Sequence, residues 1–109
     1  FINLVTFRYA FKKFLEKIKA ENYNLCNTDF YDVLKQATNS NKKYDIIFLD
    51  PPFDTNLAEV ALQKIFKLGL LTENGIVVWE HPTEYKNIRF SSKVKNSRVY
   101  GKIQIDFLS

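Results

Sequence analysis

YDIIFLDPPF, from Tyr44 to Phe53, carries the strongest structural signal in this 109-residue sequence. Its centre, Ile46–Leu49, is a continuous apolar run, which predicts a β-strand buried on both faces, as in a parallel sheet. The strand must end at Asp50, because the two prolines that follow cannot donate hydrogen bonds to a β-ladder. The prolines also have fixed φ angles, so a carboxylate, freed carbonyl groups and an aromatic ring would project from the strand end. In open α/β sheets, ligands bind at this end of the strands.

Two strand and helix pairs are expected before this stretch. Phe1–Val5 and Asn22–Asn27 predict short strands. Apolar residues recur at helical spacing from Phe7 to Ile18, with basic residues between them, which predicts an amphipathic helix with a basic outer surface. A second helix can be capped by Thr28 or Asp29.

A third helix and one more buried strand are expected after it. The residues from Asp54 to Asn56 are candidate helix caps, and Gly69 can end the helix. Asn74-Gly75 then predicts a turn into a buried strand over Ile76–Trp79.

The last quarter of the chain changes character. Val94–Tyr100 and Lys102–Leu108 predict two strands of a hairpin around Tyr100-Gly101, because apolar and polar residues alternate as they do in antiparallel sheets. The order of elements predicts an α/β fold, in which parallel strands with right-handed crossovers are followed by an antiparallel C-terminal hairpin.

The composition predicts one globular domain. The sequence is 46% hydrophobic and 16% aromatic, and no segment approaches the roughly 20 apolar residues of a membrane span. A single cysteine, Cys26, excludes an intrachain disulfide, and with a single histidine it leaves no Cys/His zinc site, which favours a reducing, cytoplasmic compartment. The formal charge of +4 allows an anionic partner such as nucleic acid, although ordinary solubility accounts for the same small excess.

Asp50-Pro51-Pro52-Phe53 resembles the (D/N)PP(F/Y) motif of amino-group methyltransferases that use S-adenosylmethionine. The exocyclic amine of a base is a poor nucleophile, because its lone pair is delocalised into the ring. An oxygen of Asp50 and the carbonyl of Pro51 can accept the two amine hydrogens and leave the lone pair aimed at the methyl group, while Phe53 stacks on the base. The alternative interpretation of the same residues is a tight turn that ends a strand, with Phe53 in the core.

A longer resemblance supports the first interpretation. YDIIFLDPPF, LLTENGIVVWEHP and YGKIQIDFL resemble, in order and spacing, the C-terminal half of the bacterial small-subunit ribosomal RNA guanine-N2 methyltransferases, the RsmD family. The resemblance extends over most of Tyr23–Leu108. It implies a partial, Rossmann-like class I methyltransferase sheet, S-adenosylmethionine as the cofactor, and ribosomal RNA or an assembling small ribosomal subunit as the partner, with no metal and no membrane.

The resemblance also implies roles for residues outside the motif. Asp29 would contact the adenine amino group of the cofactor, with Phe30 beside it, and a helix cap is the alternative role for Asp29. Glu80 and His81 would lie on the substrate side, and the alternative for them is a polar pair at a strand end that faces water.

The sequence departs from the family on the cofactor side. Its three glycines, at positions 69, 75 and 101, provide no counterpart of the family's Gly-rich loop or of the first strand before it. Thr6 stands where the family has an acidic residue that binds ribose. We therefore expect residues 1–109 to form a single partial methyltransferase domain of a longer chain, with exposed edges on both neighbours of the missing strand. Such a chain alone should bind S-adenosylmethionine weakly or not at all.

The sequence thus predicts methylation of the N2 amine of a guanine in small-subunit ribosomal RNA. One alternative is methylation of adenine N6 in DNA, because the motif is shared. The other is a truncated, non-catalytic nucleic-acid-binding remnant. The lysines of the first helix, with Lys93, Lys95 and Arg98, are candidates for contacts with phosphates.

Overall fold

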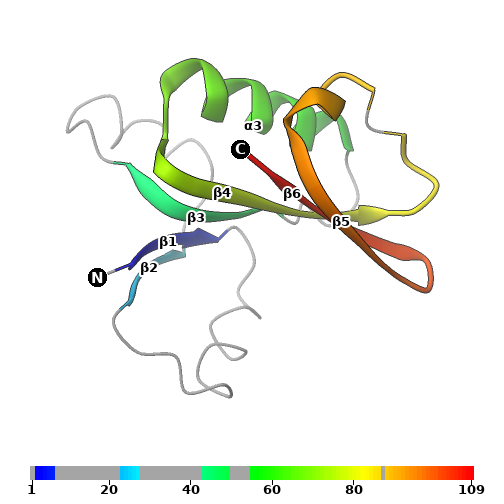
Figure 1. Cartoon of the computed structure of the whole chain (residues 1–109), viewed down its shortest axis with the longest axis horizontal. Helices are drawn as coiled ribbons and strands as arrows, with labels where there is room; N and C mark the ends of the chain where they lie inside the picture. The colour runs from blue at the N-terminus through cyan, green and yellow to red at the C-terminus, as the bar shows by residue number, and fades with distance from the viewer. Residues whose placement is uncertain (1, 7–22, 28–42, 50–54, 87) are drawn as a thin grey trace.

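A computed structural model describes residues 2–6, 23–27, 43–49, 55–86 and 88–109 of the chain (Figure 1). The described strands are β1 (Ile2–Thr6), β2 (Tyr23–Asn27), β3 (Tyr44–Leu49), β4 (Leu71–Pro82), β5 (Val94–Tyr100) and β6 (Ile103–Leu108). They form one sheet in the order β2-β1-β3-β4-β6-β5, with helix α3 (Thr55–Leu68) and a short 3-10 helix, η1 (Ser91–Lys93). The helices predicted over 7–18 and after Thr28 or Asp29 lie outside the described residues. No helix within the described ranges is long and apolar enough to cross a membrane.

The strand directions confirm the predicted α/β fold. β2, β1, β3 and β4 are parallel neighbours, whereas β6 runs antiparallel to both β4 and β5. The prediction of exposed strand edges in the middle of the sheet was wrong. β1 pairs directly with β3, with Leu4 opposite Ile46 and Thr6 opposite Phe48, so the backbone groups of these two edges bond to each other.

Strand β4 is longer than predicted, because Asn74-Gly75 is part of the strand and not a turn before it. Tyr44 pairs with Leu71, and Ile46 pairs with Ile76, so the register shifts across a bulge in β4. A Cβ atom on Gly75 would lie 2.9 Å from the carbonyl oxygen of Tyr44 and 3.1 Å from Cβ of Leu71. This glycine is therefore required by the close approach of two backbones.

We expect Gly75→Ala to lower the free energy of unfolding by about 3 kcal/mol, because the added methyl group meets backbone atoms that cannot move without shifting two strands. Gly101→Asn is the control, because Gly101 has a φ of +62° and open space around it. Asparagine tolerates that conformation, so the control should cost within about 1 kcal/mol. Urea denaturation of both variants measures the difference. Equal midpoints would show that the bulge widens freely.

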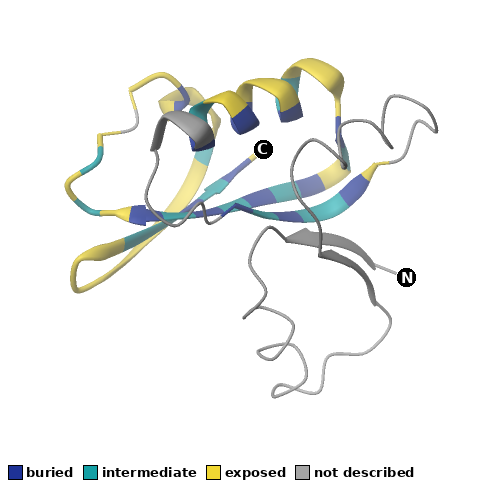
Figure 2. Ribbon diagram, turned by 180° about the vertical axis from the view of Figure 1, so that it is seen from behind, coloured by how far each residue is buried: buried dark blue, intermediate teal, exposed yellow. Residues whose placement is uncertain are grey.

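Helix α3 covers one face of the sheet (Figures 1 and 2). Its inner side carries Ala58, Ala61, Leu62 and Ile65, which are buried and lie at helical spacing. The helix ends as predicted at Gly69, which has a φ of +62°, and the N–H of Leu70 donates to the carbonyl of Ile65 at 3.0 Å. The core below the helix consists of Tyr44, Ile47, Leu49, Leu70, Val77, Trp79, Phe90 and Leu108, together with the four helix residues.

Candidate functional site

The carboxyl ends of β3 and β4 meet at one edge of the sheet. Leu49, the last residue of β3, pairs with Trp79, and β4 continues through Glu80 and His81 to Pro82. Five residues, 50–54, join the end of β3 to the start of α3. Asp50, Pro51, Pro52 and Phe53 belong to this connection and lie outside the described residues, as do Asp29 and Phe30. The sequence motif therefore lies between two described elements, the end of β3 and the start of α3.

His81 is buried at this edge, and both of its ring nitrogens face acceptor oxygens. Nε2 lies 2.7 Å from Oδ2 of Asp106, and Nδ1 lies 2.9 Å from the carbonyl oxygen of Pro82. His81 thus links the carboxylate of Asp106 on β6 to the backbone at the end of β4. Glu80, half-buried, lies on the opposite face of β4, because successive side chains of a strand alternate.

Asp106 of β6 is the centre of this polar cluster. The side chain is 2% exposed. Its Oδ1 accepts hydrogen bonds from Oγ of Ser97 at 2.6 Å and from Nε2 of Gln104 at 2.7 Å. Burial raises the pKa of the Asp106 carboxyl, but hydrogen bonds from Ser97, Gln104 and His81, and the charge of His81, together hold this pKa below its ordinary value. Asp106 is therefore a carboxylate at neutral pH.

The His81 ring also packs against two aromatic side chains, Trp79 and Tyr85. The ring centroid of Trp79 lies 4.6 Å from that of His81 and 5.4 Å from that of Tyr85, and Trp79 is fully buried. The Tyr85 hydroxyl donates a hydrogen bond to Glu59 of α3. Burial, this hydrogen bond and the charge of Glu59 raise the pKa of Tyr85, so the phenol stays protonated as a donor. The segment after β4 is thus fixed to the helix that follows the sequence motif.

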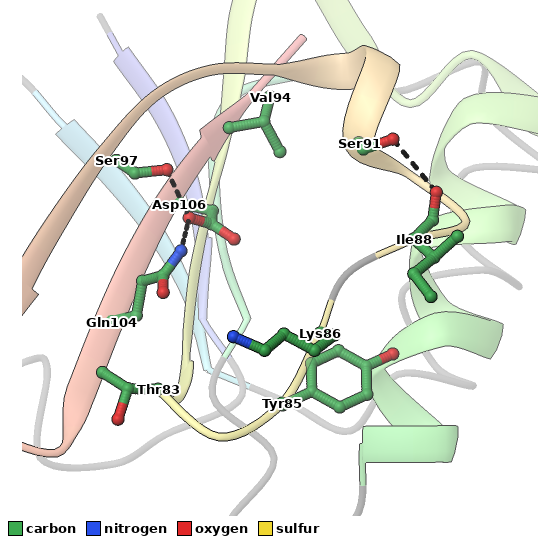
Figure 3. Close-up of a pocket in the computed structure, with 9 residues that line it drawn as sticks. All are labelled: Thr83, Tyr85, Lys86, Ile88, Ser91, Val94, Ser97, Gln104 and Asp106. Atoms are coloured by element: carbon green, nitrogen blue, oxygen red, sulfur yellow. Dashed lines mark hydrogen bonds between the residues drawn. The ribbon is translucent and has the colours of Figure 1, made fainter.

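A cavity of about 540 Å³ lies beside Asp106, between the β5–β6 hairpin and the segment that follows β4 (Figure 3). Its walls include Thr83, Tyr85, Lys86 and Val94. Figure 3 shows Ser97 and Gln104 directed at the same carboxylate oxygen. The Asp106 oxygen at the cavity wall is thus already bonded to protein groups. Among the described residues, no cluster of three or more histidine, cysteine, aspartate or glutamate side chains could hold a metal ion.

Sequence reasoning missed Asp106, Ser97 and Gln104. In β6 the alternation of residues puts Ile103, Ile105 and Phe107 on the apolar face, yet Asp106 and Leu108 are the buried residues of this strand. The alternation therefore puts Asp106 on the polar face, and the sequence carries no signal of its burial.

The basic residues predicted to contact phosphates are in different surroundings. Nζ of Lys93 lies 5.1 Å from the ring centroid of Phe66, in a cation–π contact with α3. Lys95 and Arg98 are exposed on β5. Their contact with phosphate stays a prediction.

The family of the chain is shown by comparison with known proteins. The family model described as Conserved hypothetical protein 95 matches residues 5–109. The chain belongs to this family.

Among its relatives is the Ribosomal RNA small subunit methyltransferase D of Buchnera aphidicola subsp. Baizongia pistaciae, which is 35% identical over 72 residues, or 66% of this chain and 35% of the relative. The enzyme of the same name from Haemophilus influenzae is 37% identical over 71 residues, or 63% of this chain and 36% of the relative. These matches confirm the RsmD-like resemblance, and they span about a third of each relative's length.

Solved structures of candidate methyltransferases share the fold of this chain. The candidate methyltransferase YhhF of Escherichia coli aligns with a TM-score of 0.64 and 22% identity, over 96% of this chain and 61% of that one. SMU.776, a candidate methyltransferase complexed with SAH, aligns with a TM-score of 0.56 and 17% identity, over 96% of this chain and 38% of that one. This family member therefore has a partial Rossmann-like methyltransferase fold, as predicted.

Proposed function

We propose that this chain forms the substrate-amine side of an S-adenosylmethionine-dependent enzyme that methylates the N2 amine of a guanine in small-subunit ribosomal RNA. The observation that carries the proposal is that β3 ends at Leu49, at the carboxyl edge of a sheet with a methyltransferase fold, and that the sequence continues from there with Asp50-Pro51-Pro52-Phe53. The names of the relatives, which are ribosomal RNA small subunit methyltransferases, support it. A ribosomal substrate implies a cytoplasmic protein.

In this proposal the motif holds the nucleophile in place. An oxygen of Asp50 and the carbonyl oxygen of Pro51 accept the two hydrogens of the amine, and Asp50 also stabilises the positive charge that develops on nitrogen. Phe53 stacks on the target base and fixes its plane. Holding the amine in line with its electrophile then supplies the larger part of the catalysis.

The residues of this chain fit only part of a cofactor site. S-adenosylmethionine would supply an electrophilic methyl group, and we propose that Asp29 holds its adenine amino group with Phe30 alongside. However, β1 and β3 are direct neighbours, and the three glycines, at positions 69, 75 and 101, all come after β3. This sequence therefore has no Gly-rich loop that would let the backbone come close to the methionine part of the cofactor. This supports the proposal that residues 1–109 are one part of a methyltransferase domain.

We assign different roles to the two polar residues at the end of β4. Glu80 is the proposed substrate-side residue of the pair. His81 has both ring nitrogens bonded within the protein, so its proposed role is to position the strand end, through Asp106 and the Pro82 carbonyl.

The decisive experiment is methyl transfer from labelled S-adenosylmethionine to unmethylated small-subunit ribosomal RNA by the complete native protein, with mapping of the modified base. Naked RNA, assembling particles and unmethylated DNA are compared as substrates. Label on guanine N2 of the RNA is expected. Label on adenine N6 of the DNA would establish the alternative reaction, and a complete absence of transfer would favour a non-catalytic remnant.

A further inference from the structure

The tip of the β5–β6 hairpin, residues 98–103, lies at the same edge of the sheet as the end of β4. Pro82 pairs with Ile103, and the N–H of Thr83 donates to the carbonyl of Lys102 at 2.9 Å. Because β6 runs antiparallel to β4, the turn that precedes β6 projects beyond the carboxyl edge (Figure 1). The hairpin tip therefore borders the edge at which the Asp50 motif leaves β3.

Large apolar side chains are exposed at the hairpin tip. Val99 is 61% exposed, Tyr100 is 64% exposed and Ile103 is 43% exposed. They account for three of the six large hydrophobic side chains that are exposed in the described part of the chain. A connection of two residues, Gly101 and Lys102, with a φ of +62° at the glycine, joins the strands and fixes the direction of the neighbouring side chains. An exposed aromatic on a constrained turn is suited to contact a partner.

The exposed charges of the hairpin itself are of one sign. Lys95, Arg98 and Lys102 are exposed, whereas Asp106, the only acidic residue of the hairpin, is buried and bonded on both oxygens. The Arg98 guanidinium donates to Oδ1 of Asn96 at 2.9 Å and to the carbonyl of Ser97 at 3.1 Å. Both acceptors are neutral, so they orient Arg98 without neutralising its charge. The hairpin thus presents an ordered cation beside an exposed aromatic ring.

We propose that the hairpin tip binds ribosomal RNA beside the target nucleotide, with Tyr100 stacked on an unpaired base and with Arg98 and Lys102 against phosphates. The inference rests on the proposed function and names the surface by which the same site holds its substrate. Stacking on aromatic rings and backbone contact by basic residues are the usual means of gripping unpaired RNA. A second copy of the chain fits less well, because Lys95 and Arg98 of the edge strand would repel their own counterparts.

The test measures binding of a labelled stem-loop of unmethylated small-subunit ribosomal RNA to the complete native protein by fluorescence anisotropy, over a range of salt concentrations. Tyr100→Ala should bind about tenfold more weakly, whereas Tyr100→Phe keeps the stacking ring and should bind as the wild type does. Arg98→Gln combined with Lys102→Gln should lower the slope of log affinity against log salt by about 1.4, which is about 0.7 for each lost phosphate contact.

The matched control is Lys64→Gln combined with Lys67→Gln. These exposed lysines are in the C-terminal half of α3, whose end adjoins the start of β3, at the opposite edge of the sheet. The control removes the same charge and should leave the salt slope unchanged. Equal effects of the two double variants would overturn the inference, because they would indicate nonspecific attraction.

The results separate this inference from the proposed function. Wild-type affinity and salt slope in the hairpin variants would overturn the inference even if methyl transfer to guanine proceeds. The oligomeric state of the same variants is measured by light scattering. Variants that lose self-association but keep RNA binding would also overturn the inference and would assign the tip to a second copy. RNA binding that depends on Tyr100, in a protein that transfers no methyl group, would uphold the RNA surface and reject the proposed enzyme activity.

Discussion

Replacing Asp106 with alanine is expected to lower the free energy of unfolding by about 3 to 5 kcal/mol, because it leaves the buried His81 ring without its charged partner. Nε2 of His81 is buried and lies 2.7 Å from the carboxylate, and no other protein group replaces this partner in the variant. Ser97 and Gln104 would lose the same acceptor. Chemical denaturation of the chain at neutral pH measures the loss.

Asp106→Asn is the control for shape. The amide keeps one oxygen that can accept from Ser97 or Gln104, but it removes the charge that pairs with His81. We expect the free energy of unfolding of Asp106→Asn to lie between the values of the wild type and the alanine variant. A Ser97→Ala variant removes one donor and should cost about 1 kcal/mol. An alanine variant at Asp106 that unfolds at the wild-type denaturant concentration would refute the role of this cluster.

The same carboxylate should make stability fall in acid. The pKa of Asp106 in the folded protein lies below its ordinary value of 3.8, so the unfolded chain takes up the proton more readily. The stabilisation is complete above the ordinary pKa, and it is lost as the pH falls through the lower, folded value. Below about pH 5, wild-type stability should therefore decline more steeply than that of Asp106→Asn. Parallel curves of unfolding free energy against pH would contradict this assignment.

Local sequence signals predicted much of the fold. The end of β3 at Leu49 follows from the prolines beyond Asp50, and the bounds of β5, Val94–Tyr100, follow from the alternation of its residues. Gly69 ends α3 because only a glycine readily adopts the required φ. These features depend on neighbours in sequence, which a pattern can detect.

Contacts between distant strands could not be predicted in the same way. Asn74-Gly75 has the composition of a turn, and only the pairing of β4 with Tyr44 makes it a bulge. His81 and Asp106 are 25 residues apart, and their contact depends on the register of β4 against β6. In the candidate site, the sequence therefore drew attention to His81 at the end of β4, but not to the carboxylate that holds this ring. The chemistry of the motif stays a prediction.

Replacing Asp50 with alanine is expected to lower the rate of methyl transfer by the complete protein by about 100- to 1000-fold. In the proposed mechanism, the alanine removes the acceptor that orients the amine and stabilises the positive charge on its nitrogen as the new bond forms. Asp50→Asn should keep part of the rate, because its amide oxygen still accepts a hydrogen bond and the related motif permits asparagine. Single-turnover transfer of labelled methyl to RNA measures these rates.

Two binding measurements make the Asp50 prediction specific to the chemical step. Because Asp50 acts on the amine, the affinity for S-adenosylmethionine, measured by calorimetry, and the affinity for RNA should both stay near the wild-type values. A fall in rate with both affinities kept assigns Asp50 to the transition state, since an interaction made only there lowers the rate without weakening binding. Unchanged turnover in Asp50→Ala would remove this residue from the mechanism. The motif would then be a strand-ending turn, whose rigidity follows from the two prolines alone.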